Sequence, residues 1–170
     1  MTATLPSTKK AERIERAKYL LRTVRHAAMA TVNEDSSPHN TPYRFMIADD
    51  LSRVYWGSHP NSVHSRNIVR TGQLFIVLYE ADQRGGLYIT AGDGHQTEGK
   101  ELKEALAVHN RIRTSAGESP IELSYYEGGS PQRMWMATPT NFWINGTIPD
   151  QNGHIVEDIR VEVTPAELLA

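Results

Sequence analysis

The spacing of hydrophobic residues changes along the chain from a helical period to an alternating one. Residues 7–25 carry apolar side chains at helical intervals and charges of both signs on the other faces, which predicts an amphipathic helix packed on a sheet. Beyond it, short apolar or alternating runs separated by turn-rich segments are typical of strands. These runs predict strands at 27–32, 43–47, 53–58, 74–79, 87–92, 133–137 and 158–163, with 141–145 between the last two.

Helical segments interrupt the predicted strands. Residues 62–70 follow the break at 59–61, with Asn61 as the expected N-cap, and 98–113 place apolar residues on one face. Thr164-Pro165 are expected to open a last short helix. Short turns make the first three strands antiparallel neighbours. We therefore expect a mainly β fold, a small closed or half-closed antiparallel β-barrel with flanking helices.

Composition and charge narrow the classes of function. The 170 residues make one domain, 1–170, with a helix in 1–25 and the barrel in 26–163. A net charge of −2 with scattered cations indicates no nucleic-acid partner, and the sequence shows neither an apolar run that spans a bilayer nor a secretory signal. Without cysteine there is no disulfide or thiolate site, and the seven histidines show no metal-ligand spacing. We expect a cytoplasmic protein without a metal.

A polar cluster lies where a predicted strand runs into a predicted helix. Its loop and first helical turn carry Ser58, Ser62, His64, Ser65 and Arg66. Free backbone N–H groups and the helix dipole favour an anion at such a place, and hydroxyls and a guanidinium suit a phosphate. Gly57 would let a ligand approach the backbone closely. The alternative is a serine-rich loop that only caps a helix.

Two further clusters have two interpretations each. Arg44 lies within a predicted strand and needs a partner, which is either a carboxylate at a subunit interface or a phosphate or flavin carbonyl. Trp135, Phe142 and Trp143 form core or dimer interface, or stack on a flavin. Gly92-Asp93-Gly94 predicts a turn. No G-x-S-x-G elbow is present, and we assign no catalytic residue.

The order of these segments is similar to that of a known family. The matching segments are the strand 38–43, the strand end Tyr55-Trp56-Gly57-Ser58, the segment 62–68, the buried strand 74–79 and the glycine-led strand 86–89. Segment 62–68 matches a Ser-x-Lys-x-x-Asn-hydrophobic pattern. In this respect the chain resembles the pyridoxamine 5′-phosphate oxidase-like FMN-binding family, well over 21–112 and more loosely over 133–143.

The resemblance implies a Greek-key antiparallel split β-barrel that forms a homodimer with FMN sites at the subunit interface. By position, Ser58, Ser62, His64 and Arg66 would surround the FMN phosphate, while Thr41, Tyr43 and Arg44 would follow the ring and ribityl chain. Trp143 would reach the site from the partner subunit. The full expected set of cofactor residues is Thr41, Tyr43, Arg44, Trp56, Gly57, Ser58, Ser62, His64, Ser65, Arg66 and Trp143.

The implied function is an FMN-dependent oxidoreductase that transfers hydride to or from a small organic substrate. Two departures from the family pattern affect the substrate: His64 replaces the usual lysine, and Asp49 stands five residues after Arg44 where pyridoxamine phosphate oxidases carry lysine. A vitamin B6 phosphate is therefore not the expected substrate. The alternatives are a reductase that uses the deazaflavin F420 and a non-catalytic flavin- or haem-binding module.

Overall fold

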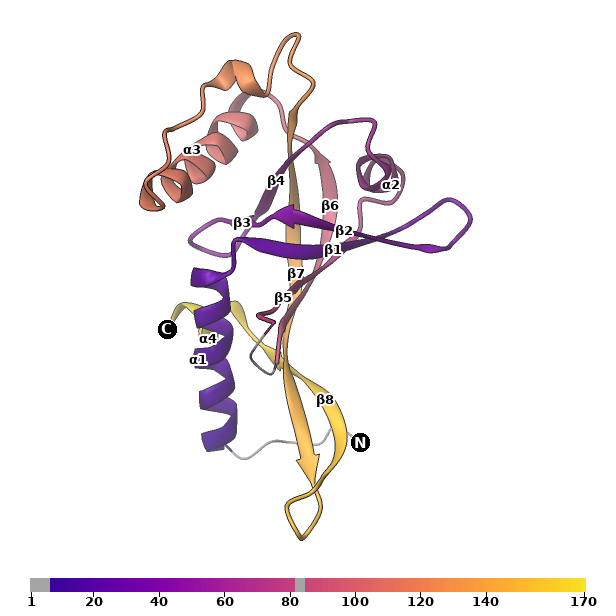
Figure 1. Ribbon diagram of the computed structural model, residues 1–170, viewed down its shortest axis with the longest axis vertical. Coiled ribbons are helices and arrows are strands. Elements are labelled where there is room, and N and C mark those ends of the chain that lie inside the picture. The colour runs from indigo at the N-terminus through magenta and orange to yellow at the C-terminus, as the bar shows by residue number, and fades with distance from the viewer. Residues whose placement is uncertain (1–6, 82–84) are drawn as a thin grey trace.

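A computed structural model describes residues 7–81 and 85–170 (Figure 1). The elements are α1 (Ser7–Thr23), β1 (His26–Val32), β2 (Pro38–Arg44), β3 (Met46–Ile47), β4 (Val54–Ser58), α2 (Val63–Thr71), β5 (Leu74–Leu78), β6 (Leu87–Gln96), α3 (Gly99–Ser115), the 3₁₀ helix η1 (Leu123–Tyr125), β7 (Arg133–Pro149), β8 (Ile155–Val163) and α4 (Pro165–Leu169). Within this described part, no helix is long and apolar enough to cross a bilayer.

The strands form one antiparallel sheet in the order β2-β1-β5-β6-β7-β4-β3, and β8 pairs with β7 beside this path. The two ends of the path, β2 and β3, are separated in sequence by Phe45 alone. The sheet therefore curls back toward itself, and the ring of Tyr43 on β2 lies 6.3 Å from that of Trp56 on β4. The predicted antiparallel barrel with flanking helices is confirmed as a split barrel, because the sheet is not closed.

Two hydrophobic clusters lie on opposite faces of the curled sheet. The larger one fills its concave side, where the rings of Trp56 and Trp135 stack 6.4 Å apart, and α1 and α4 pack against it. The smaller one lies between β3, β4 and β7 and the layer made by α3 and η1. Residues 54–56 of β4 are consequently buried on both faces, and their continuous apolar run follows from that double cover.

The structure corrects three sequence predictions. The strand expected at 43–47 begins at Pro38 and is divided between β2 and β3. The segments 133–137 and 141–145 belong to one strand, β7, which continues to Pro149. Pro139 interrupts the strand pattern of β7, but it lies opposite Ala91 at a register shift between β6 and β7. The regular hydrogen bonding of the two strands is interrupted there, so the missing proline N–H removes no regular hydrogen bond. Gly92-Asp93-Gly94 is part of this irregularity within β6 and not a turn, with Asp93 at φ 54°.

Candidate cofactor site

The junction between β4 and α2 places three serines around one histidine. Ser62 is the N-cap of α2, with φ −65° and ψ 155°, and its side chain accepts the Ser65 N–H at 3.3 Å. The expected N-cap, Asn61, is therefore wrong by one residue, since Ser62 is the residue whose oxygen reaches the third N–H of the helix. The helix ends at Thr71, and its C-cap residue Gly72 has a φ of 66°, which favours glycine.

The hydroxyls and the imidazole form a closed network. His64 Nε2 lies 2.7 Å from Ser58 Oγ and 3.0 Å from Ser62 Oγ, and these two hydroxyl oxygens are 3.0 Å apart. Ser62 Oγ also donates to the fully buried Ser65 Oγ at 2.8 Å. Four of the five residues of the predicted polar cluster thus lie together at the start of α2. The fifth, Arg66, is exposed and donates to the Asn61 carbonyl.

The wall opposite this network is β2. His39, Thr41 and Tyr43 alternate onto one face of the strand, as their register with β1 shows. The rings of His39 and His64 stack with centroids 6.4 Å apart and planes at 19°. Burial, and second the nearby His39 charge, lower the pKa of His64 below its ordinary value of 6.5. His64 is therefore mainly neutral at pH 7, and the network offers hydroxyls and backbone N–H groups rather than a cation.

Two predicted cofactor residues lie in the barrel core. Trp56 is fully buried and Tyr43 is 8% exposed. Burial raises the pKa of Tyr43 well above 10, and its hydroxyl makes no hydrogen bond within the described residues. The alternation of β2 explains why Tyr43 is buried, because Tyr43 is the inner end of the strand face that begins at His39. These two residues support the site from beneath.

Arg44 points to the other face of β2 and is already paired. Its guanidinium donates to both carboxylate oxygens of Glu118, at 2.8 and 3.2 Å, and Arg113 binds the same carboxylate at 2.8 Å. The hydrogen bond from Arg44 lowers the pKa of Glu118. The structure thus gives Arg44 a carboxylate partner within its own chain, instead of the subunit-interface or cofactor partner that the sequence left open.

Gly57 and Trp143 also face other groups within the chain. A Cβ on Gly57 would lie 3.0 Å from Tyr126 Oη, so the glycine makes room for a tyrosine of the α3–η1 layer. Trp143 is half-buried on the outer face of β7, opposite Tyr88 of β6 and Glu162 of β8. Its expected reach into a partner's site stays a prediction.

Two residues of the site were missed by the sequence analysis. His39 stacks on His64, and the alternation His39-Thr41-Tyr43 was the signal that would have placed it on the same face. Asn67 is 6% exposed and donates to Thr31 Oγ1 at 3.0 Å and Asn33 Oδ1 at 2.9 Å. It fixes α2 against the end of β1 and so sets the position of the serines.

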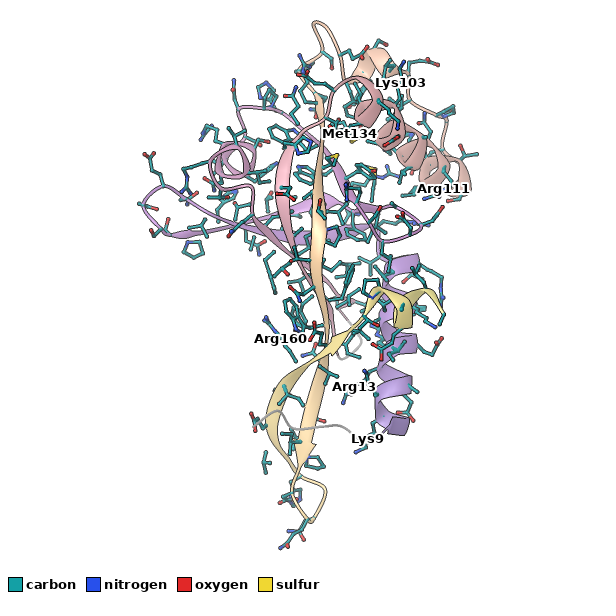
Figure 2. All side chains as sticks on the ribbon, turned by 180° about the vertical axis from the view of Figure 1, so that it is seen from behind. Lys9, Arg13, Lys103, Arg111, Met134 and Arg160 are labelled. Atoms are coloured by element: carbon teal, nitrogen blue, oxygen red, sulfur yellow. The ribbon has the colours of Figure 1, made fainter. Side chains whose placement is uncertain are left out.

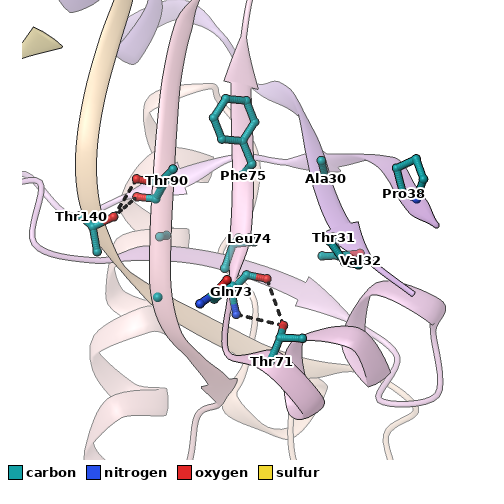
Figure 3. A pocket seen from close by; sticks show the side chains of 12 residues that line it. Ala30, Thr31, Val32, Pro38, Thr71, Gln73, Leu74, Phe75, Thr90 and Thr140 are labelled. Carbon is teal, nitrogen blue, oxygen red and sulfur yellow. Dashed lines mark hydrogen bonds between the residues drawn. The ribbon is translucent and has the colours of Figure 1, made fainter. Parts of the chain in front are cut away.

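A shallow groove of about 700 Å³ lies on the outer face of the sheet (Figure 3). Apolar and threonine side chains line it, among them Ala30, Val32, Phe75, Thr90 and Thr140. Thr90 Oγ1 and Thr140 Oγ1 lie 2.7 Å apart at one side. Among the described residues, no group of three or more potential ligand residues could hold a metal ion.

Comparison with known proteins identifies the fold. No family model and no curated protein matches the sequence. Among solved structures, the haem-binding protein from Mycobacterium smegmatis matches with 17% identity and a TM-score of 0.61, over 98% of this chain and 62% of that one. The chain therefore spans less than two thirds of that protein.

Two further structures match over nearly their whole length. A pyridoxamine 5′-phosphate oxidase-related FMN-binding protein from Nostoc punctiforme has 12% identity and a TM-score of 0.55, over 96% of this chain and 99% of that one. An F420 reductase has 14% identity and a TM-score of 0.54, over 75% and 94%. The chain has the split-barrel fold of the pyridoxamine 5′-phosphate oxidase-related proteins, as its sequence predicts.

Proposed function

We propose that this chain is an FMN-binding oxidoreductase that acts on a small organic substrate. The observation that carries the proposal is the network of Ser58, Ser62, Ser65 and His64 at the N-terminus of α2. Hydroxyl donors, free N–H groups and the positive end of a helix dipole together suit a phosphate ester. A split-barrel protein described as FMN-binding supports the same cofactor.

Each group has a distinct part in the proposed site. Ser58 and Ser62 would donate to phosphate oxygens, while Ser65 keeps Ser62 in place. His39 and Thr41 line the wall of β2, and Tyr43 and Trp56 support that wall from the core. Bound FMN supplies the hydride chemistry, so the protein contributes binding, orientation and electrostatics.

F420 and haem are the alternative cofactors. F420 has an acidic tail that favours cations at the site, whereas His64 is mainly neutral at pH 7 and Arg66 donates to a loop carbonyl. One observation favours haem: the stacked pair of His39 and His64 places imidazoles, which are common axial ligands of haem iron, at the wall of the site.

The first experiment is the absorption spectrum of the purified protein after FMN is added and the sample is desalted. We expect flavin bands to survive, and Ser58→Ala to weaken FMN binding about tenfold, since a hydrogen bond to a charged group contributes about 1.5–3 kcal/mol. Ser119→Ala, an exposed serine on the loop after α3, is the matched control. Retained flavin that NADH or NADPH reduces and an organic acceptor reoxidises would support the activity.

Other outcomes of this experiment reject the FMN proposal. If no flavin is retained and F420 fluorescence is quenched on mixing, the cofactor is the deazaflavin. If added haem gives a Soret band that His39→Ala abolishes, the protein is a haem-binding module.

We further propose that the protein is a homodimer that buries the outer face of the sheet. Phe75, Tyr88 and Trp143 are half-buried there beside the groove, and the Arg160 guanidinium lies 4.4 Å from the centre of the Tyr88 ring. An apolar, aromatic-rich surface next to a shallow groove is typical of a protein interface. Arg160 is labelled on this face in Figure 2.

Thr140→Arg is expected to convert this dimer into a monomer. Thr140 is exposed at the edge of the groove, so an arginine at this position leaves the core intact. In the dimer, however, its charge would be buried without a partner. Light scattering should give twice the chain mass of 19.1 kDa for the unmodified protein and 19.1 kDa for the variant. Thr114→Arg, at the exposed end of α3, should remain dimeric. A monomer before any substitution would contradict the proposal.

A further inference from the structure

A second cleft, of about 410 Å³, opens where α1, the turn between β3 and β4, α3 and α4 meet. In Figure 1 this turn lies between the ends of α1 and α3, on the side of the sheet away from α2. The floor is apolar and includes side chains from all four segments. Its members are Leu21, Ile47, Leu51, Ile112 and Leu168, of which Leu51 and Leu168 are 7% and 6% exposed.

The rim of this cleft is strongly basic. It carries Lys18, Arg22, Arg25 and Arg111, with Asp49 as the single carboxylate among the lining residues. Lys18 pairs with Glu15 at 2.9 Å and Arg111 pairs with Asp49. Arg22 and Arg25 are exposed, and their guanidinium groups make no ion pair or hydrogen bond within the part of the chain that the structure describes. Two guanidinium groups therefore remain available above an apolar floor.

Compensation of helix dipoles explains only part of this arrangement. Arg22 lies in the last turn of α1, where a cation is favourable. Arg25 lies beyond the helix, and its carbonyl accepts the Phe45 N–H at 2.9 Å as part of the start of the sheet. Dipole compensation requires neither Arg25 nor a hollow with apolar walls beneath the cations.

We propose that this cleft binds a small organic anion with an apolar body. The carboxylate or phosphate group is held by Arg22 and Arg25, whose planar donors match both groups. The apolar part lies against Leu21, Ile47 and Leu168. The volume is within the usual range for small-molecule sites. This site is separate from the proposed FMN site and does not depend on it.

Octanoate is a suitable probe, titrated into the ¹⁵N-labelled full chain and followed by amide chemical shifts. We expect shifts centred on Leu21, Ile47 and Leu168, with the Ser58 and Ser62 amides unmoved. The apparent affinity should fall as salt rises, since the recognition is partly electrostatic. Octanol, which has the same apolar chain without the charge, should bind at least tenfold more weakly.

The double variant Arg22→Gln/Arg25→Gln should weaken octanoate binding at least tenfold. The matched control, Lys100→Gln/Lys103→Gln, removes two charges from the exposed side of α3 and should bind like the unmodified protein. Lys103 and Arg111 are labelled on this helix in Figure 2. Shifts centred on the outer groove, equal binding of octanol, or undiminished binding by the arginine double variant would each overturn the proposal.

Discussion

The His64→Glu variant is expected to lose at least about 100-fold in affinity for FMN, which corresponds to about 3 kcal/mol. His64 Nε2 lies 2.7 Å from Ser58 Oγ and 3.0 Å from Ser62 Oγ, so a carboxylate in its place would stand among the groups proposed to hold the phosphate. Like charges in a partly buried site repel more strongly than in water. Quenching of FMN fluorescence at pH 7.5 measures the affinity.

Riboflavin, which lacks the phosphate, is the control ligand for this variant. Its affinity should change less than about threefold, whereas equal losses for FMN and riboflavin would place His64 against the ring system. His64→Lys should instead tighten FMN binding about tenfold. In the unmodified protein FMN binding should tighten as the pH falls below 7, because a bound phosphate favours the protonated imidazole, whose pKa burial and the His39 charge otherwise lower.

The sequence predicted the parts of this site that are local. Ser58, Ser62, His64 and Ser65 fall within eight residues of one another, so the geometry of one turn and one helix start brings them together. The partners of His39 and Arg44 could not be predicted in the same way, because they depend on how strands that are distant in sequence curl together. The partner of Arg44 is Glu118, 74 residues later in the chain, and no local pattern joins the two.

The strand boundaries show the same division between local and distant effects. The amphipathic patterns predicted both ends of α1, α2 and α3 to within about two residues. The prediction did not join 133–137 and 141–145 into one strand. Between them lies Pro139, a residue type that is rare inside strands, and here it coincides with a register shift against the partner strand β6. Trp56 and Tyr43 were assigned to the cofactor by the family resemblance, whereas their burial follows from the way that the curled sheet brings β2 and β4 together around the larger core.

His109 is a buried histidine whose environment opposes its charge. It is 4% exposed, its Nδ1 lies 3.0 Å from Tyr126 Oη, and its Nε2 is buried without a hydrogen-bond partner among the described residues. Burial, and then the charges of Arg44 and Arg113, lower its pKa from 6.5 to about 4, against a small opposite effect of Glu118. The folded protein therefore holds His109 neutral over a pH range in which the unfolded chain protonates it.

Acidification from pH 7 to pH 4 is expected to remove about 3 kcal/mol of unfolding free energy through this residue. The sign follows from the lowered pKa: between pH 6.5 and 4 the unfolded chain binds the proton and the folded protein does not. The stabilisation is complete above pH 6.5 and is lost as the pH falls toward 4. Since His109 joins α3 to Tyr126, which covers Gly57, this layer should loosen first.

Urea unfolding of the unmodified protein and of His109→Gln at pH 7, 6, 5 and 4 tests this expectation. Glutamine keeps a polar group beside Tyr126 but cannot take up the proton, so the variant should lose about 3 kcal/mol less than the unmodified protein over this range. The other titrating groups are common to both proteins and cancel in the difference. His26→Gln, at an exposed strand end, should follow the unmodified protein. Parallel pH profiles for the unmodified protein and His109→Gln would contradict this expectation. They would show that burial of His109 does not contribute to the pH dependence of the unfolding free energy.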